Sequence, residues 1–186
     1  MIPELGHFLL IIAAMTALLA PAVVFYGIRR GDDFYAGFSR PASLLTALML
    51  TLSTAALVWA FLTDDFSVAY VANHSNTKLA PAYKAAALWG SHEGSMLLWI
   101  WLMAVGTAGA GFVRCADRLF TARLQGLMLA VLAGFCAFLL FTSNPFLRNL
   151  PMVPPDGRDL NPILQDIGMI CLLYTSPSPR DGATSR

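Results

Sequence analysis

The chain has 186 residues, of which 57% are hydrophobic and only 12% are charged, and its formal net charge is +1. A soluble globular domain carries about 25% charged residues, so this composition is typical of a membrane protein, and the near-neutral charge argues against nucleic-acid binding. The three cysteines form no CxxC pair, which excludes a thioredoxin-like redox motif.

Four apolar runs are long enough to cross a bilayer as helices, which takes about 20 residues. The predicted spans cover residues 5–28, 42–62, 95–113 and 124–142, and the last three contain no charged residue. Ionised groups are costly in hydrocarbon, and backbone polar groups there must be satisfied within the segment. We therefore predict an all-α membrane protein, a polytopic helical bundle with four complete transmembrane helices.

The start of the first run bears on whether it is a cleaved signal peptide. No Lys or Arg precedes its apolar core, Glu4 stands there instead, and Arg29 and Arg30 follow the run at once. A signal peptide has the opposite arrangement, with positive charge ahead of the apolar core. The sequence therefore favours an uncleaved helix.

The loops between the runs differ in basic charge. Residues 29–40 and 114–123 each hold three arginines, whereas the longer loops 63–94 and 143–168 have a lower density of Lys and Arg. Basic loops stay on the cytoplasmic side of a membrane. We expect the two arginine-rich loops to face the cytoplasm, and the N-terminus and the two longer loops to lie on the periplasmic side.

The densest local chemistry lies at the start of the third run, in Trp89, Gly90, Ser91, His92, Glu93, Gly94 and Ser95. Three- and four-residue spacing predicts that Trp89, His92 and Glu93 share one helix face. Gly90 and Gly94 form a GxxxG pattern, which permits close helix approach. A His–Glu pair at a membrane boundary could relay protons or orient a ligand. The alternative that we favour is structural: the two side chains satisfy each other while the glycines pack.

The other two histidines stand apart from this motif. His7 lies near the outer end of the first span, where we expect interface packing, and His74 lies in a loop, where we expect solvation. Histidines without a shared spacing do not form a metal site. We predict no metal ligand in the chain.

The C-terminal residues have an unusual pattern. A new apolar run begins at Met169 but stops after six residues, which is too short for a span. The stretch Cys171–Asp181 resembles a translated sequencing adapter. We therefore predict that residues 171–186 are a non-native tail, that residues 1–170 form the native part, and that the gene continues past Ile170.

Several separated motifs in residues 1–170 resemble the CcmF/NrfE family of cytochrome c maturation proteins. The matching stretches follow in chain order: Pro3–Phe8, Tyr70–Ala72, His74–Asn76, Tyr83–Lys84, Trp89–Ser95, Leu98–Trp99, Ser143–Phe146 and Gly157–Asp166. One departure is Ile167, where the family usually has proline. The paralogues CcmF and NrfE are not distinguished by these residues.

The resemblance implies an inner-membrane heme lyase that delivers heme to apocytochrome c for covalent attachment at CxxCH. It implies heme as the cofactor. The partners that it implies are the heme-chaperone and thiol-reducing subunits of the maturation system, and apocytochrome c. Such an enzyme acts by holding heme and thiols in position.

The resemblance carries few site residues into this chain. The family's first heme-ligating histidine should follow Ile170 in a His-Pro-Pro motif, but Cys171 and Leu172 stand there. The family's tryptophan-rich segment is missing too. We therefore expect no catalytic, metal-binding or heme-binding residue in this fragment, which should be inactive alone. The six residues that match the family signature are expected to act in positioning and packing: Trp89, Gly90, His92, Glu93, Gly94 and Ser95.

A rival hypothesis is a proton- or ion-translocating membrane subunit with Glu93 as its carboxylate site. Such proteins also carry charged residues in the middle of their spans. The second, third and fourth runs have none, which weighs against ion transport. The downstream gene would discriminate, since histidines and a tryptophan-rich loop favour heme whereas mid-span lysines favour ion transport.

Overall fold

A computed structural model describes residues 1–113, 117–149, 154 and 156–158, and the predicted tail at 171–186 lies outside this part. The described chain is helical. Its elements in order are α1 (Ile2–Arg30), α2 (Asp33–Ala36), α3 (Ser39–Leu62), α4 (Ala69–His74), α5 (Pro81–Ala86), the 3₁₀ turn η1 (Ala87–Trp89), α6 (His92–Ala110) and α7 (Arg118–Phe141).

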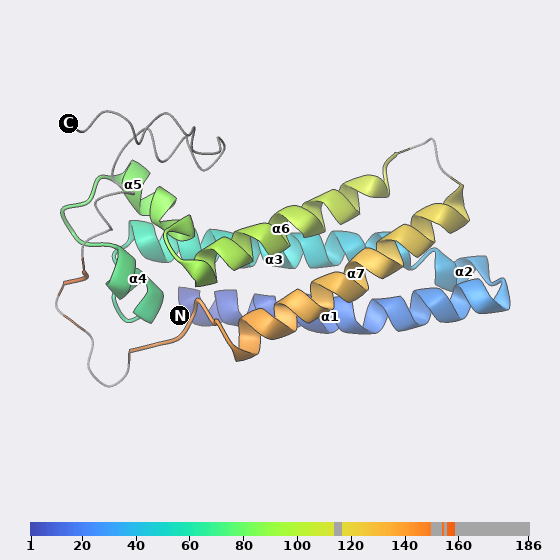
Figure 1. The fold of residues 1–186 in the computed structure, drawn as a ribbon, viewed down its shortest axis with the longest axis horizontal. Coiled ribbons are helices and arrows are strands. Elements are labelled where there is room, and N and C mark those ends of the chain that lie inside the picture. The colour runs from blue at the N-terminus through green and yellow to red at the C-terminus, as the bar shows by residue number, and fades with distance from the viewer. Residues whose placement is uncertain (114–116, 150–153, 155, 159–186) are drawn as a thin grey trace, which may run out of the picture.

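The four long helices form an antiparallel bundle (Figure 1). α1 packs on α3 and α7, and α6 packs on the other side of the same two helices, so the order around the bundle is α1, α3, α6, α7. The short helices α4 and α5 lie at the end near the N-terminus, which we call the outer end. α2, the end of α6 and the start of α7 lie at the opposite end, which we call the basic end. The described arginines of the two arginine-rich loops belong to the helix ends that meet there.

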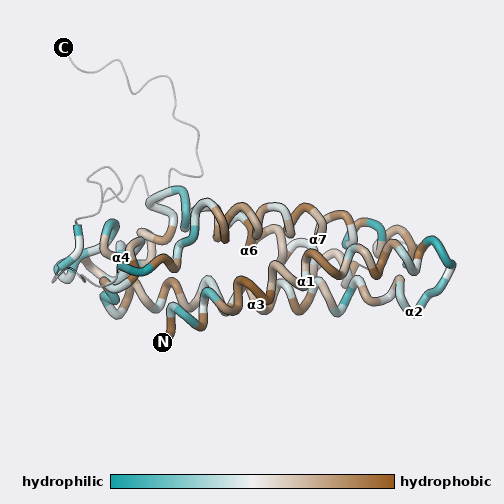
Figure 2. Tube along the Cα trace, turned by 90° about the horizontal axis from the view of Figure 1, so that it is seen from below, coloured by the Kyte–Doolittle hydropathy of each residue, from teal (hydrophilic) through white to brown (hydrophobic). Residues whose placement is uncertain are grey.

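The bundle has the apolar character of a membrane domain. Figure 2 shows hydrophobic residues along the shafts and hydrophilic residues gathered at the two ends. In the described part of the chain, three helical stretches are long and apolar enough to cross a membrane: Ile2–Arg30, Asp33–Leu62 and Arg118–Phe141. α6 is not one of these three stretches, but its 19 residues reach roughly 28 Å. The predicted all-α membrane bundle of four long helices is confirmed.

Small residues hold the helices close together, as α1 illustrates. Ala13, Ala17 and Ala20 are buried at spacings of three and four residues, whereas Phe8 and Leu18 of the same helix are exposed. Small side chains inside and large apolar side chains outside are the arrangement that lipid favours, because close backbone approach drives helix association there. The exposed apolar residues are thus the lipid-facing surface of the bundle.

The ends of α1 follow from local chemistry. Pro3 lies in the first turn, where its missing N–H is not needed, and Glu4 there complements the helix dipole. Arg29 and Arg30 occupy the last turn, where positive charge is favourable. Gly31 then adopts a left-handed conformation with φ 68°, which ends the helix and suits glycine.

A fully buried amide side chain links three of the long helices. Gln125 of α7 accepts a hydrogen bond from the Ser39 hydroxyl at 2.9 Å. Its amide nitrogen donates to the Ser43 hydroxyl at 3.0 Å and to the Thr107 carbonyl at 3.1 Å. These bonds join α3, α6 and α7, and they satisfy a polar group that would otherwise be costly in an apolar interior.

The two outer loops pack on each other across the end of the bundle. The backbone N–H of Ala69 donates to the Leu147 carbonyl at 2.8 Å, and the N–H of Asn149 donates to Ser67 at 2.9 Å. The Arg158 N–H donates to the Ala72 carbonyl at 2.7 Å. Segments distant in sequence therefore form one outer cap, made of residues 64–95 and 143–149 with residues 156–158.

Candidate functional site

The signature segment Trp89–Ser95 does not form one continuous helix. The 3₁₀ turn η1 ends at Trp89, Ser91 is extended with φ −148° and ψ 177°, and α6 begins at His92. The predicted common helix face for Trp89, His92 and Glu93 is therefore wrong. The chain changes direction between the first of these residues and the other two, so regular helical spacing does not apply across Ser91.

Gly94 and Tyr70 fix the geometry of this bend. The Tyr70 hydroxyl from α4 donates a hydrogen bond to the Leu88 carbonyl at 2.9 Å and lies 3.3 Å from the Ala87 carbonyl. A Cβ at Gly94 would collide with the Leu88 carbonyl and would lie 2.5 Å from the Tyr70 hydroxyl oxygen. Gly94 thus permits close approach, but to the preceding turn and to Tyr70 rather than to another long helix.

Two further side chains of the segment bond within it. The Ser95 hydroxyl donates to the Trp89 carbonyl at 3.1 Å, and the Ser91 hydroxyl donates to a Glu93 carboxylate oxygen at 2.9 Å. Glu93 also lies in the first turn of α6, where a negative charge is favourable. Its hydrogen-bond partner is Ser91, so the expected mutual satisfaction of His92 and Glu93 is replaced by a local serine–carboxylate bond.

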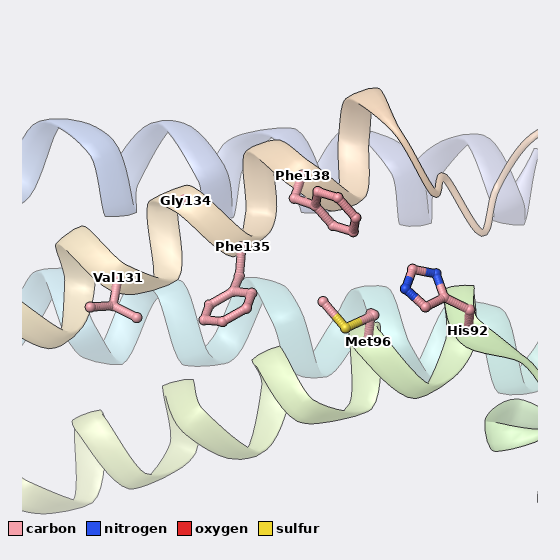
Figure 3. A pocket seen from close by; sticks show the side chains of 6 residues that line it. All are labelled: His92, Met96, Val131, Gly134, Phe135 and Phe138. Carbon is pink, nitrogen blue, oxygen red and sulfur yellow. The ribbon is translucent and has the colours of Figure 1, made fainter.

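His92 points away from this network (Figure 3). Its ring meets the Phe138 ring of α7 edge-on, with centroids 6.0 Å apart. It stands at one end of an open groove of about 500 Å³ between α6 and α7, also lined by Met96, Val131, Gly134, Phe135 and Phe138. The groove walls are apolar, so the imidazole is the polar group that the groove offers.

The other two histidines each have a partner within the cap. His7 Nε2 lies 3.5 Å from Asn144 Nδ2, and the His7 ring stacks against Phe146 at 6.4 Å. His74 is the last residue of α4, and its Nδ1 lies 2.9 Å from the Tyr70 carbonyl oxygen. His74 is therefore half-buried in the cap and not the solvated loop residue expected from the sequence. No group of three or more metal-ligating side chains occurs in the described part of the chain.

Burial raises the pKa of the Tyr70 phenol well above its usual range. The folded protein thus holds the phenol proton to a higher pH than the unfolded chain, whose tyrosine pKa is about 10. We expect the Tyr70 contribution to be constant below about pH 10 and to decrease as the pH rises further. Chemical unfolding between pH 8 and 11.5 measures this. Tyr70→Phe should remove part of the alkaline loss, whereas Tyr83→Phe should retain it; equal alkaline loss in all three proteins would contradict the expectation.

A second feature of the cap is an ion pair that the sequence motifs did not indicate. Lys84 of α5 is 6% exposed, and its Nζ contacts both carboxylate oxygens of Asp64, at 2.6 and 2.5 Å. Asp64 directly follows the end of α3 and adopts φ 53°. The pair joins α5 to the end of α3. The 20-residue separation of the two charges gives no periodic signal in the sequence.

The arrangement at the outer end is suited to positioning. The signature residues other than His92 bond or pack within the cap. The cap gives the four-helix bundle a fixed outer surface with one exposed imidazole above an apolar groove. Such a surface can support a binding site formed with further protein segments.

The comparisons with known proteins agree on one group. No family model matches the chain. It is 46% identical over 171 residues to the cytochrome c-type biogenesis protein CcmF of Pseudomonas aeruginosa and also 46% identical to CcmF of Escherichia coli, covering 91% of this chain and 26% of each relative. It is 43% identical to the cytochrome c-type biogenesis protein NrfE of Haemophilus influenzae, covering 91% of this chain and 27% of that relative.

A solved structure supports the same relationship. The structure titled cytochrome c heme lyase CcmF superposes with a TM-score of 0.73 at 27% identity, over 78% of this chain and 25% of that one. The chain spans about a quarter of the length of the relatives that it matches. The resemblance read from the signature motifs is confirmed: the chain belongs to the CcmF/NrfE family of cytochrome c-type biogenesis proteins.

Proposed function

We propose that this chain is part of an inner-membrane heme lyase that delivers heme to apocytochrome c for covalent attachment at CxxCH. The observation that carries the proposal is the 46% identity to CcmF over 171 residues, together with the fold shared with a solved structure titled heme lyase. The part described here supplies four long helices and a packed outer cap. In the proposed enzyme, these helices and the cap hold one side of the protein in position.

The described residues do not form a site for heme. The His7 and His74 rings are engaged within the cap, by Asn144 and by the Tyr70 carbonyl. His92 stands alone above an open apolar groove. We therefore assign no heme-ligating role to the described residues. We propose that the signature residues Trp89–Ser95 act in positioning and packing, which the bonds from Ser91 to Glu93 and from Ser95 to Trp89 support.

The proposed setting follows from the distribution of charge. The described arginines of the two arginine-rich loops share the basic end of the bundle, and basic loops stay in the cytoplasm. The outer cap and the N-terminus then face the periplasm, where the heme-chaperone and thiol-reducing subunits and apocytochrome c are the proposed partners. Cysteine introduced at exposed Lys78 and labelled with an impermeant reagent on intact cells tests this orientation; labelling only after cell lysis would overturn it.

The proposed supporting role has a spectroscopic consequence. We expect the purified chain, mixed with heme in detergent, to show no stoichiometric Soret band from ligated iron, because its three imidazoles lie in three separate environments. Absorption titration against a full-length relative measures this. A one-to-one complex with a sharp Soret band that His92→Ala abolishes would contradict the expectation.

A chimera tests the function itself. Residues 1–170 of this chain would replace the corresponding segment of Escherichia coli CcmF, which is 46% identical. Covalent heme attachment to a reporter cytochrome c, read by heme staining, should be retained. A relative lacking the segment is the negative control. A chimera that inserts into the membrane at the normal level but attaches no heme would overturn the proposal.

A further inference from the structure

The basic end of the bundle contains a pocket that the proposed function does not use. It has a volume of about 840 Å³ and lies where α2, α3, α6 and α7 meet. Two arginines line it, Arg40 from the first turn of α3 and Arg118 at the start of α7. The hydroxyl residues Ser39 and Thr121 line it too, and Asp33 contributes a carboxylate.

Arg40 and Arg118 stand in the first turns of their helices, α3 and α7. Neither helix has an acidic residue in its first turn, and neither receives a hydrogen bond from a capping side chain. The N-terminus of a helix carries a positive partial charge and N–H groups without helical partners. The backbone therefore adds to the positive potential of the two guanidinium groups.

The two arginines differ in how far the protein fixes their side chains. The Arg40 guanidinium lies over the Phe112 ring, 4.7 Å from its centroid. The stem of Arg40 passes close to Gly111, where a Cβ would lie 3.4 Å from Arg40 Cγ. Arg118 is exposed and makes no ion pair with any residue that the structure describes. Arg40 is thus positioned by packing, and Arg118 is available to a ligand.

The polar side chain on the inner wall of the pocket needs no hydrogen bond from a ligand. Gln125 lies there, and its side chain is already bonded to Ser39, Ser43 and the Thr107 carbonyl. The polar wall is therefore satisfied within the protein. The N–H donors of the arginines remain for an external acceptor, and a planar guanidinium matches the oxygen geometry of a phosphate.

The side chains around the pocket indicate which phosphate-containing ligand would fit it. Exposed apolar side chains flank the two arginines: Phe112 and Val113 after α6, and Leu119 and Phe120 in α7. At the end of a transmembrane bundle, exposed apolar side chains beside arginines suit the depth at which lipid chains give way to headgroups. Basic pockets between transmembrane helices at this depth suit anionic headgroups. We propose that this pocket binds the phosphate of an anionic membrane lipid.

Native mass spectrometry of the full chain in detergent, titrated with phosphatidylglycerol, tests the proposal. We expect the double variant Arg40→Gln/Arg118→Gln to bind this lipid about 30-fold more weakly. Arg123→Gln is the matched control, since Arg123 is an exposed arginine of the same helix that does not line the pocket. It should change the affinity less than about twofold. The double lysine variant, which keeps both charges, should bind better than the double glutamine variant.

Separate titrations identify the lipid as the source of the phosphate. Phosphatidylcholine with the same acyl chains should bind more weakly than phosphatidylglycerol, and inorganic phosphate at the same concentration should not displace the bound lipid. Displacement by inorganic phosphate would overturn the assignment to lipid. Equal loss of binding in Arg123→Gln and in the double glutamine variant would overturn the pocket. Circular dichroism of each variant checks that the bundle is folded.

Discussion

Gly94→Ala is expected to destabilise the protein by about 3 kcal/mol, near the upper end of the usual range for overpacking. The added methyl group would collide with the Leu88 carbonyl and crowd the Tyr70 hydroxyl, which lies only 2.5 Å from the Cβ position. The first obstacle is backbone and not the end of a flexible side chain. Relief requires α6 to move away from η1 and Tyr70, or the Leu88 carbonyl and the Tyr70 hydroxyl to shift, which disturbs the hydrogen bond between them. Unfolding in detergent, followed by circular dichroism, measures the loss.

Gly106→Ala is the matched control, since Gly106 belongs to the same helix and a Cβ there would meet nothing within 4 Å. An alanine in that open position should be neutral or stabilise the helix by about 0.4–1 kcal/mol. The comparison separates a clash at the bend from a general effect of glycine on helix stability. Equal stability of the two variants would show that the outer end is loosely packed and would contradict the proposed positioning role of the signature.

The long helices could be predicted from the sequence because lipid imposes a strict condition on each segment by itself. A charge-free apolar run must form a helix there, with its backbone hydrogen bonds closed internally. The runs at 42–62 and 124–142 lie within α3 and α7, apart from one residue at the end of the second. The element ends differ by a few residues elsewhere. α6, for example, begins at His92 because Ser91 is extended.

The bend in the signature was missed although its signal was present. Ser91 is a favoured residue just before a helix, and Glu93 is an acid in the first turn, which together indicate a helix start. The three- and four-residue spacing holds only within one continuous helix, so it placed Trp89 on the face of His92 and Glu93 although a new helix begins at His92. A local start signal should have taken precedence over the three- and four-residue spacing.

The tertiary contacts of the site could not be predicted from one sequence. The bond from Tyr70 to Leu88 joins residues 18 positions apart, and Gln125 reaches Ser39 across 86 positions. No periodicity connects such pairs, because their meeting depends on how the loops and helices pack. Gln125 is an amide residue near the start of an otherwise apolar run. Its position indicates that the side chain is buried, but the sequence does not indicate its partners.

Lys84→Met is expected to destabilise the protein by about 2–3 kcal/mol. The substitution leaves the Asp64 carboxylate without the ammonium group that contacts both of its oxygens. Removing one partner of a buried ion pair costs about 3–5 kcal/mol. The expected loss is smaller here because the Asp64 side chain is 24% exposed and water offsets part of the penalty. Lys78→Met, at an exposed lysine of the same loop, is the control and should change stability by less than about 0.5 kcal/mol.

The double variant Lys84→Met/Asp64→Asn shows whether the cost comes from the unpaired charge. Asn suits this position because Asp64 has φ 53°, and Asn adopts the left-handed conformation more readily than other residues with a side chain. With the charge removed, the double variant should recover about half of the loss of Lys84→Met. Losses that simply add would mean that the two groups are not coupled. The connection between α5 and the end of α3 would then depend on packing alone, and the cap would not need its buried ion pair.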